Sequence, residues 1–367
     1  MGTETLTTSP RSVQSSPEVG DREVVFSLHD GDLKLSSVKL CQEITRPRVG
    51  PDFERVDATG AWRLRFPRPD ADRMEYLFRL EDRDGNHETI PDPSNPERAP
   101  GPFGDKSVVE FPGYRAPAWT GGAGVLRGEE VVSRVHARSL RVDLPLIVWT
   151  SAGADEDDRL PLLIVHDGPE YARFSDLLGF LDHFTRSRDL PPMRAALLGP
   201  IERDHVYSAS TAYARALAYE IVPAIERTAP MPHGRSKRIG MGASLGALAM
   251  LHVHRTHPAV FGGLFLQSGS FFRQRFDPHE TGFVRFRRIS RFAGRVLSAT
   301  DWAHPIPVAM TCGSVEENLA NNRAMRDALS RQGYEIAWRE NRDGHNWIAW
   351  RDAFAPDLLA LLQRVWG

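Results

Sequence analysis

A serine between glycines is the part of the sequence with the clearest capacity for chemistry. Residues 240–246 read GMGASLG, in which Gly242, Ser244 and Gly246 form the pattern GxSxG. A serine hydroxyl becomes a useful nucleophile when a tight strand-to-helix turn exposes it to a base and to backbone N–H groups. The strand-like RIGM before Ser244 and the helical pattern LGALAMLHVHRTHP after it provide that setting. The stretch therefore predicts a nucleophile at Ser244, although GxSxG alone also occurs in ordinary glycine turns.

An acid and a base follow this serine in the order that such a nucleophile requires. The expected acid lies after a late strand, and the expected histidine lies in a loop near the chain end. PIPVAMTCG predicts a strand that ends at Gly313, and Glu316 and Glu317 follow it, while His345 follows the last predicted strand. Spacing does not choose between the two glutamates, because a glutamate also favours a helix N-terminus. Asp343 is a weaker candidate, because the loop near the chain end is not where the acid is expected.

The elements around these residues alternate between apolar strands and longer helical segments. From about residue 131, strand-like LPLLIVHDG, RAALLGP and SKRIGMG are separated by helical patterns such as FSDLLGFLDHFTRS and AYARALAYEIVPAIERTA. Strands buried on both faces and alternating with helices predict a doubly wound, mainly parallel sheet. The catalytic candidates then lie at strand ends of an α/β domain over residues 131–367.

The first third of the chain has a different pattern. EVVFSL, VKLC, AWRLRF, MEYLFRLED and SVVEF are short strand-like runs, and DRDGNHE carries an Asp-Gly hairpin signal. These runs predict a small β-sandwich of the immunoglobulin-like kind over residues 21–118. A polar, Ser- and Thr-rich stretch over residues 1–20 predicts a disordered tail. The Pro- and Gly-rich region that follows the sandwich predicts a linker over residues 119–130.

Composition excludes several classes of function. The net charge of the 367 residues is −2, so no concentrated positive field favours a nucleic-acid or membrane partner. RFRRISR (285–291) is the pattern of a solvated helix face or loop. Cys41 and Cys312 stand alone, which favours a reducing compartment. No signal-peptide pattern or run of roughly 18 apolar residues is present, so we expect a cytoplasmic protein.

Five longer stretches together resemble one known family. GMGASLGALAMLHVHRTHPAVFGGLFLQSGSFF, HDGPEYARF, ERDHVYSAS, LAYEIVPAIE and GHNWIAWR are similar to the enterochelin esterase (ferric enterobactin esterase) group of the esterase D type of α/β-hydrolases. The similarity runs from about Val131 to the chain end. It implies an α/β-hydrolase fold preceded by a β-sandwich, in agreement with the strand pattern of residues 21–118.

The resemblance assigns roles to the catalytic candidates. It implies that Ser244 is the nucleophile and His345 the general base. Because the family's acid stands three residues after the glycine that ends the preceding strand, it favours Glu316 over Glu317.

Two backbone donors are expected to stabilise the oxyanion. One is Leu245, directly after the nucleophile. Related enzymes take the second from the residue after the early Asp-Gly, but here that residue is Pro169, which has no N–H. Either Gly168 or Glu170 supplies the donor through a shifted loop, or the protein is a slower or partly degenerate enzyme.

The implied substrate is a trilactone of catecholoyl-serine, often as its ferric complex, which is bulky, aromatic and anionic. Aromatic faces and one positive charge are expected to bind it, from Tyr171, Phe271, Phe272, Trp347 and Arg203. Arg203 has the alternative role of stabilising its own loop. No cofactor and no protein metal site are expected, and any iron arrives with the substrate.

Three functions therefore follow from the sequence. The preferred one is a serine esterase that opens siderophore ester bonds to release iron, with a small-molecule ester as its partner. The alternatives are an esterase for feruloylated or acylated carbohydrates and a non-catalytic ligand-binding homologue. Covalent labelling of Ser244 separates the third from the first two, and substrate preference separates the first two.

Overall fold

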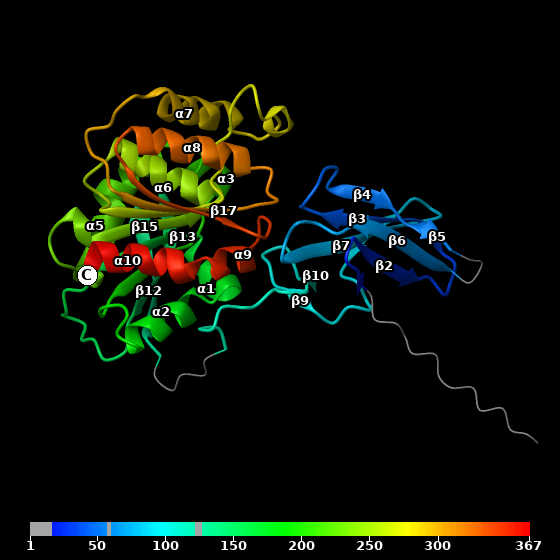
Figure 1. Ribbon diagram of the computed structural model, residues 1–367. Helices are drawn as coiled ribbons and strands as arrows, with labels where there is room; N and C mark the ends of the chain where they lie inside the picture. The colour runs from blue at the N-terminus through cyan, green and yellow to red at the C-terminus, as the bar shows by residue number, and fades with distance from the viewer. Residues whose placement is uncertain (1–16, 57–59, 122–126) are drawn as a thin grey trace, which may run out of the picture. The chain divides into compact units, whose positions relative to one another are not determined.

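The computed structural model describes residues 17–56, 60–121 and 127–367, which form two compact units (Figure 1). The first unit contains the described residues up to Ala99 together with Phe103–Pro112, and the second contains Pro100–Pro102 and Gly113–Gly367. Residues 1–16, most of the segment expected to be a disordered tail, lie outside the described residues. Among the helices of the described residues, none is long and apolar enough to cross a membrane.

The first unit consists of two antiparallel sheets. One sheet has the order β1-β2-β6-β5, and the other has the order β4-β3-β7-β10-β9 with β8 paired to β7. The strands are β1 (Glu18–Val19), β2 (Glu23–His29), β3 (Leu35–Gln42), β4 (Val49–Asp52), β5 (Glu54–Arg55), β6 (Ala61–Pro67), β7 (Arg73–Asp82), β8 (His87–Ile90), β9 (Arg98–Ala99) and β10 (Lys106–Glu110).

Side chains from both sheets share one core, so the predicted β-sandwich is confirmed. Phe26 of β2, Leu64 of β6 and Phe78 of β7 belong to the same buried cluster. Along β6, buried and exposed residues alternate, as a strand with one face toward a core requires. The strand β1 corrects the N-terminal boundary, because Glu18 pairs with Val25 inside the range that we expected to be disordered.

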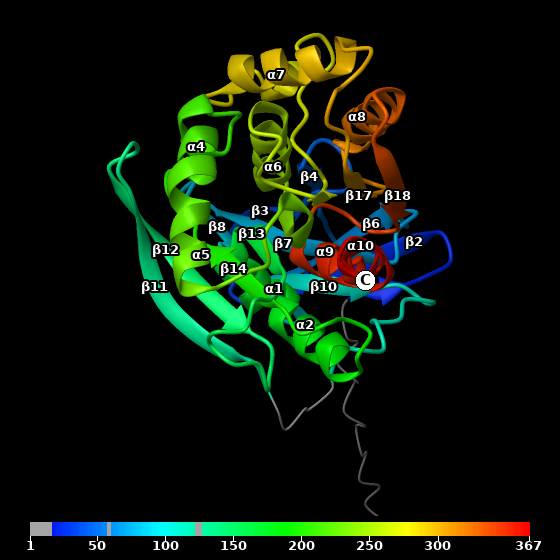
Figure 2. The ribbon, with the colours of Figure 1, turned by 90° about the vertical axis from the view of Figure 1, so that its left-hand side faces the viewer.

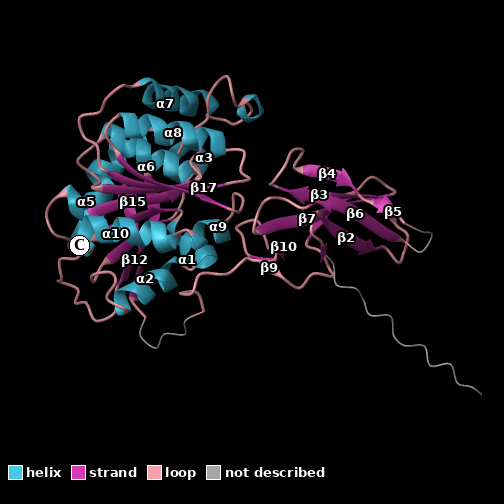
Figure 3. Cartoon of the chain, in the orientation of Figure 1, coloured by secondary structure: helices cyan, strands magenta, loops and turns pink. Residues whose placement is uncertain are grey.

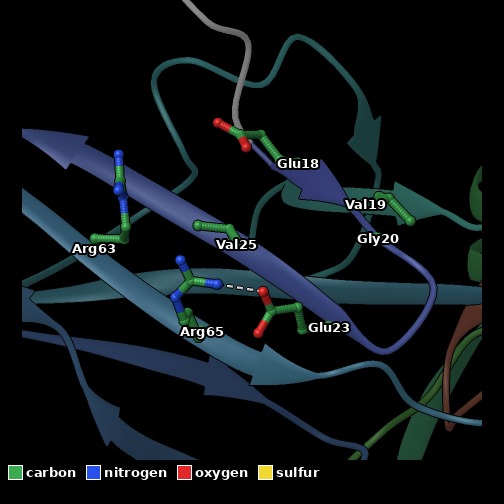
Figure 4. A pocket seen from close by; sticks show the side chains of 7 residues that line it. All are labelled: Glu18, Val19, Gly20, Glu23, Val25, Arg63 and Arg65. Atoms are coloured by element: carbon green, nitrogen blue, oxygen red, sulfur yellow. Dashed lines mark hydrogen bonds and ion pairs between the residues drawn. The ribbon is translucent and has the colours of Figure 1, made fainter.

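A hollow of about 460 Å³ lies against β1, β2 and β6 of this unit (Figure 4). Glu23 and Arg65 line the hollow and form an ion pair with each other, and Glu18 and Arg63 also line it. Two acidic and two basic side chains balance one another here. The charge of the hollow therefore selects neither an anionic nor a cationic ligand.

The second unit is built on one eight-stranded sheet in the order β11-β12-β14-β13-β15-β16-β17-β18. The first two strands form an antiparallel hairpin at one edge (Figure 2), and all strands from β14 onward are parallel. The strands are β11 (Glu129–Ala137), β12 (Val142–Thr150), β13 (Leu162–His166), β14 (Arg194–Leu198), β15 (Arg238–Ala243), β16 (Gly263–Gln267), β17 (Pro307–Gly313) and β18 (Glu335–Asn341).

Helices cover both faces of this sheet (Figure 3), so the predicted doubly wound α/β fold is confirmed. One face packs against α6 and its neighbours, and the other packs against α1, α2 and α10. The α-helices are α1 (Gly168–Ser175), α2 (Leu177–Arg186), α3 (Arg203–Val206), α4 (Thr211–Ala216), α5 (Val222–Thr228), α6 (Leu245–Thr256), α7 (Phe286–Ser298), α8 (Leu319–Arg331), α9 (Trp347–Asp352) and α10 (Leu359–Trp366). Shorter helical turns are η1 (Leu217–Ile221), η2 (Arg235–Lys237), η3 (Pro278–Glu280) and η4 (Phe354–Leu358).

The segment between the two predicted domains is more ordered than a linker. Trp119 is 5% exposed and belongs to a core cluster of the second unit. Strand β11 already begins at Glu129, and the Gly128 N–H donates to Asp182 over 2.7 Å. Residues 122–126 of the predicted linker lie outside the described residues. The described parts of residues 119–130 therefore belong to the α/β unit.

Helix α6 carries two buried histidines. Its residues from Leu245 to His254 are all buried, which makes it the central helix of its layer. Burial, together with nearby arginines, lowers the pKa of His252 to about 4 and that of His254 to about 3. Both rings are therefore neutral at physiological pH.

We expect His254 to make the protein sensitive to mild acid. Its pKa is below the unfolded value of about 6.5, so its stabilising contribution is complete above pH 6.5 and is lost as the pH falls toward 3. Between pH 7 and pH 5 this loss is about 2 kcal/mol. Denaturant unfolding at both pH values should show that a His254→Leu variant loses about 2 kcal/mol less than the wild type. Equal losses in the two proteins would contradict the assignment.

Candidate active site

The Ser244 turn joins β15 to α6. Ser244 has a φ of 55° and a ψ of −121°, a conformation that non-glycine residues rarely adopt and that surrounding contacts must maintain. Its N–H donates to the Gln267 carbonyl over 2.9 Å, and its own carbonyl accepts from the Ser270 N–H over 3.1 Å. The chain at the end of β16 therefore holds Ser244 in its sharp turn.

Gly242 has a steric role in this turn. A Cβ atom at Gly242 would lie 2.6 Å from the carbonyl carbon of Gly246 in the first turn of α6. Contacts shorter than 3 Å are not tolerated, so strand and helix approach this closely only because residue 242 is glycine. This close approach is the reason for the first glycine of the GxSxG pattern.

Neighbouring strands bring the catalytic candidates to one edge of the sheet. Strands β15, β16, β17 and β18 are consecutive and parallel. Ser244 follows β15, Glu316 follows β17 and His345 follows β18. Carboxyl ends of parallel strands share one edge, which is where open α/β sheets bind their ligands.

His345 and Glu316 are in direct contact. Nδ1 of His345 lies 2.7 Å from Oε2 of Glu316. A carboxylate only accepts hydrogen bonds, so Nδ1 carries the proton and Nε2 is left as the acceptor. The Glu316 side chain is 1% exposed and that of His345 is 30% exposed. A buried acid thus orients a partly accessible imidazole, as a general base requires.

The second oxygen of Glu316 has partners that sequence reasoning missed. Oε1 accepts from the Ser268 hydroxyl over 2.6 Å and from the Gly313 N–H over 2.8 Å. The Trp350 indole N–H donates to the Ser268 hydroxyl over 3.0 Å. These bonds fix the carboxylate, because Ser268 follows β16 and Gly313 is the last residue of β17. A serine after a buried strand gives no sequence signal that distinguishes this role from an ordinary turn.

The two alternative acids have other partners. Oε2 of Glu317 lies 3.9 Å from Nε2 of His279. Asp343 is buried, and its carboxylate accepts from the Gly344 N–H and from the Asn346 side chain. The residue that contacts His345 is therefore Glu316, the one that the resemblance favours.

Helix α6 begins directly after Ser244, with Leu245 as its first residue. The first N–H groups of a helix have no acceptor within the helix and point along its axis toward the preceding turn. The N-terminal end of the helix also carries a partial positive charge. Leu245 thus remains the candidate for the first oxyanion donor.

The first turn of α1 contains the other oxyanion candidates. Pro169 occupies the start of this helix, and the Tyr171 N–H donates to the Asp167 carbonyl over 2.9 Å. Burial raises the pKa of Glu170, whereas its own backbone N–H opposes this increase. Gly168 and Glu170 both remain candidates for the second donor, and Gly168 is the first residue of α1, so its N–H has no acceptor within the helix.

Asp167 and Arg203 form a bidentate ion pair beside this turn. The Arg203 guanidinium donates to both Asp167 carboxylate oxygens at 2.8–3.0 Å. The Asp167 side chain is only 3% exposed, and that of Arg203 is 33% exposed. Burial alone would lower the pKa of Arg203, but Asp167 raises it above the ordinary value. This ion pair supports the loop-stabilising role of Arg203, and its contact with substrate stays a prediction.

Three of the aromatic residues expected to bind substrate are buried in the protein. Tyr171 and Phe271 are 0% exposed, and Phe272 is 6% exposed. The Tyr171 hydroxyl donates to the Gln267 side chain over 2.8 Å, and Phe271 belongs to the core on the α6 face. Because these three side chains are buried, the expectation that they contact substrate is wrong. Residue type alone did not show this, since aromatic side chains also fill cores.

Trp347 differs from these three, because it is only partly buried. Its ring packs edge-on against Tyr171 at a centroid distance of 5.3 Å and against Trp350 at 4.8 Å. It lies two residues after His345, at the start of α9. Phe276 is 66% exposed, and the Arg273 guanidinium lies over its ring at 4.3 Å. Trp347 thus remains a candidate for substrate contact, and Phe276 is an aromatic surface that the sequence did not single out.

One group of side chains in the described residues has the composition of a metal site. His279, Glu280 and Glu317 bring one ligand atom each within 4.8 Å of one another. The sequence gives no signal for this cluster, because residues 279 and 317 are far apart in the chain. The same atoms also have the spacing of an ion-pair group, with His279 Nε2 3.7 Å from Glu280 Oε1. We assign no metal to it.

Comparison with known proteins places this chain in a family. The family model named Esterase, described as a putative esterase, matches residues 140–361, which include the Ser244 turn, Glu316 and His345. The chain belongs to the esterase family. The match covers most of the α/β unit and none of the β-sandwich.

Individual relatives cover more of the chain than the family model does. An iron(III) enterobactin esterase of Escherichia coli O6:H1 is 26% identical over 309 residues, which cover 81% of this chain and 73% of the relative. The enterobactin esterase of Shigella flexneri, crystallised in the presence of enterobactin, has a TM-score of 0.75 at 21% identity and covers 96% of both chains. A ferulic acid esterase has a TM-score of 0.57 at 17% identity and covers 66% of this chain and all of its own. The fold of this esterase, including its β-sandwich, is thus the fold of the enterobactin esterase.

Proposed function

We propose that this esterase uses Ser244, His345 and Glu316 to hydrolyse the ester bonds of a catecholate siderophore trilactone. The observation that carries the proposal is the bond between His345 Nδ1 and the buried Glu316 carboxylate, at the same edge of the parallel sheet as the Ser244 turn. The relatives named iron(III) enterobactin esterase support the substrate class. The cargo iron of a ferric siderophore would enter and leave with the substrate.

The proposed reaction is the general serine-hydrolase scheme. Nε2 of His345 accepts the Ser244 hydroxyl proton while Oγ forms a bond to the ester carbonyl carbon. The N–H groups of Leu245 and Gly168 stabilise the resulting oxyanion. The ester C–O bond then breaks, and His345 returns the proton to the leaving alkoxide. Water, deprotonated by His345, attacks the acyl-enzyme, His345 returns this proton to the Ser244 oxygen, and the acyl group leaves as a carboxylic acid that gives its remaining proton to solvent.

Glu316 has an electrostatic role in both steps. It holds the imidazole in the tautomer that leaves Nε2 free, and its charge stabilises the imidazolium that forms. Its remaining lone pairs are satisfied by Ser268 and Gly313, so the carboxylate stays fixed while the charge develops.

Substrate preference tests the proposed substrate class. We expect kcat/KM for an enterobactin-like trilactone to exceed that for a feruloylated sugar by at least about tenfold, or 1.4 kcal/mol. The physical reason is that a trilactone offers three equivalent esters and aromatic arms, while the fold similarity to a ferulic acid esterase covers only 66% of the chain. Steady-state hydrolysis of both compounds by the same preparation measures the ratio.

Each outcome of this experiment has a clear meaning. A ratio in favour of the feruloylated sugar would overturn the siderophore assignment and leave the esterase chemistry intact. No hydrolysis of either compound, nor of p-nitrophenyl butyrate, would overturn the esterase proposal and favour a ligand-binding homologue.

A further inference from the structure

A fully buried histidine lies at the end of β13, and the mechanism above does not use it. His166 is 0% exposed and directly precedes Asp167 and Gly168. Its Nδ1 lies 3.2 Å from the carbonyl oxygen of Gly246, in the first turn of α6. Its Nε2 lies 2.7 Å from the Tyr213 hydroxyl. Both ring nitrogens are therefore used inside the protein.

The chemistry of the partners fixes the tautomer. A carbonyl oxygen only accepts, so Nδ1 of His166 donates to Gly246 and Nε2 accepts from the Tyr213 hydroxyl. Burial lowers the pKa of His166 to about 4, which keeps the ring neutral at physiological pH. The Tyr207 ring stacks on the imidazole at a centroid distance of 4.3 Å. The ring is held in one orientation by two hydrogen bonds and one stacking contact.

The Gly246 bond connects the two backbone segments that carry the oxyanion donors. Gly246 follows Leu245 on α6, and Gly168 follows His166 by two residues on the other segment. A Cβ atom at Gly246 would lie 3.3 Å from the His166 Cβ and 3.4 Å from Asp167 Oδ2, so the segments are already in close contact. The bond from His166 to Gly246 therefore joins these two segments, and the distance between the segments sets the distance between the N–H groups of Leu245 and Gly168.

We propose that His166 is a positioning residue, whose Nδ1–H bond to the Gly246 carbonyl sets the spacing between the oxyanion donors Leu245 and Gly168. The inference rests on the proposed function, because it matters only if an oxyanion forms beside Ser244. Preorganised donors are effective because they need no rearrangement when charge develops, so a change in their separation should reduce transition-state binding more than substrate binding.

Two polar variants separate the two ring nitrogens. The side-chain amide of His166→Asn reaches the position of Nδ1 and retains a donor for Gly246. His166→Gln reaches the position of Nε2, retaining contact with Tyr213 and losing the Gly246 bond. Matched controls are His254→Asn and His254→Gln, since His254 is also 0% exposed but lies at the far end of α6. The probes are p-nitrophenyl butyrate for turnover and a trifluoromethyl ketone for the tetrahedral adduct.

We expect His166→Gln to lower kcat by about 100-fold with little change in KM, the effect of losing one oxyanion donor. Trifluoromethyl ketone affinity should fall by a similar factor, because its adduct carries the same oxyanion. His166→Asn should stay within about fivefold of the wild type, and both His254 variants should keep the wild-type kcat, since only the Gly246 bond enters this effect.

Three results would overturn the positioning role. They are equal losses in His166→Asn and His166→Gln, a loss that follows thermal stability in all four variants, or unchanged ketone affinity in His166→Gln. If one His166 variant fails to fold, the other one decides the question by its own kcat and ketone affinity. A wild type that hydrolyses no ester would instead overturn the proposed function and this inference with it, so the two failures are distinguishable.

Discussion

Replacing Ser244 with alanine is expected to lower kcat for ester hydrolysis by about 10⁵- to 10⁶-fold, as the loss of a catalytic serine does in other hydrolases. The physical reason is that Oγ supplies the nucleophile, and no step of the proposed reaction proceeds without it. Alanine adopts the strained turn no less readily than serine, so the fold should persist. The expected stability cost is the bond between the Ser244 and Ser270 hydroxyls at 3.1 Å, or about 1 kcal/mol.

Ser270→Ala is the matched control for this variant. It removes the other hydroxyl of the same pair, from a residue that is 2% exposed and follows β16. Its kcat should fall by less than about tenfold, because it loses one neutral hydrogen bond. Progress curves with p-nitrophenyl butyrate measure both variants. A Ser244→Ala protein with more than a tenth of wild-type turnover, or an inactive Ser270→Ala protein beside an active Ser244→Ala protein, would contradict the assignment.

Replacing Glu316 with glutamine is expected to lower kcat by about 10⁴-fold, the loss known for the amide substitution in a serine triad. The amide oxygen can keep the two bonds from Ser268 and Gly313, so the side chain should stay in place. Its NH₂ group then faces Nδ1 of His345 and forces the tautomer in which Nε2 carries the proton. That tautomer cannot accept the Ser244 proton.

Glu317→Gln is the control, because it makes the same chemical change one residue away. Glu317 lies beside His279, so its kcat should stay within about threefold of the wild type. Steady-state kinetics and circular dichroism of the two variants make the comparison. If Glu317→Gln were the inactive protein, or if Glu316→Gln kept wild-type turnover, the acid would be assigned to the wrong residue.

Most of the architecture could be predicted from the sequence because its signals are local. Strand β13 is an unbroken apolar run, and helix α6 follows a glycine-containing turn. The order of Ser244, Glu316 and His345 along the chain could be recognised because parallel strands place their loops at one edge. The boundary between α1 and α2 was missed, because the left-handed conformation of Asp176 that separates them has no clear sequence signature.

The substrate-facing residues could not be predicted in the same way. Tyr171 and Phe271 have the residue types of an aromatic binding site and also those of a core, and only the packing of the sheet distinguishes the two. Ser268 and His166 act through partners that are 48 and 80 residues away in the chain. Their roles depend on tertiary contacts, which the spacing of residues in one sequence does not show.

The central claim is that Ser244 is an activated nucleophile, and covalent labelling tests it most directly. Reaction of the folded full-length chain with a fluorophosphonate, followed by peptide mass spectrometry, should place one adduct on Ser244. The adduct should be absent in Ser244→Ala and should form far more slowly in Glu316→Gln. No adduct on the folded wild type, or an adduct on Ser270 in its place, would contradict the account.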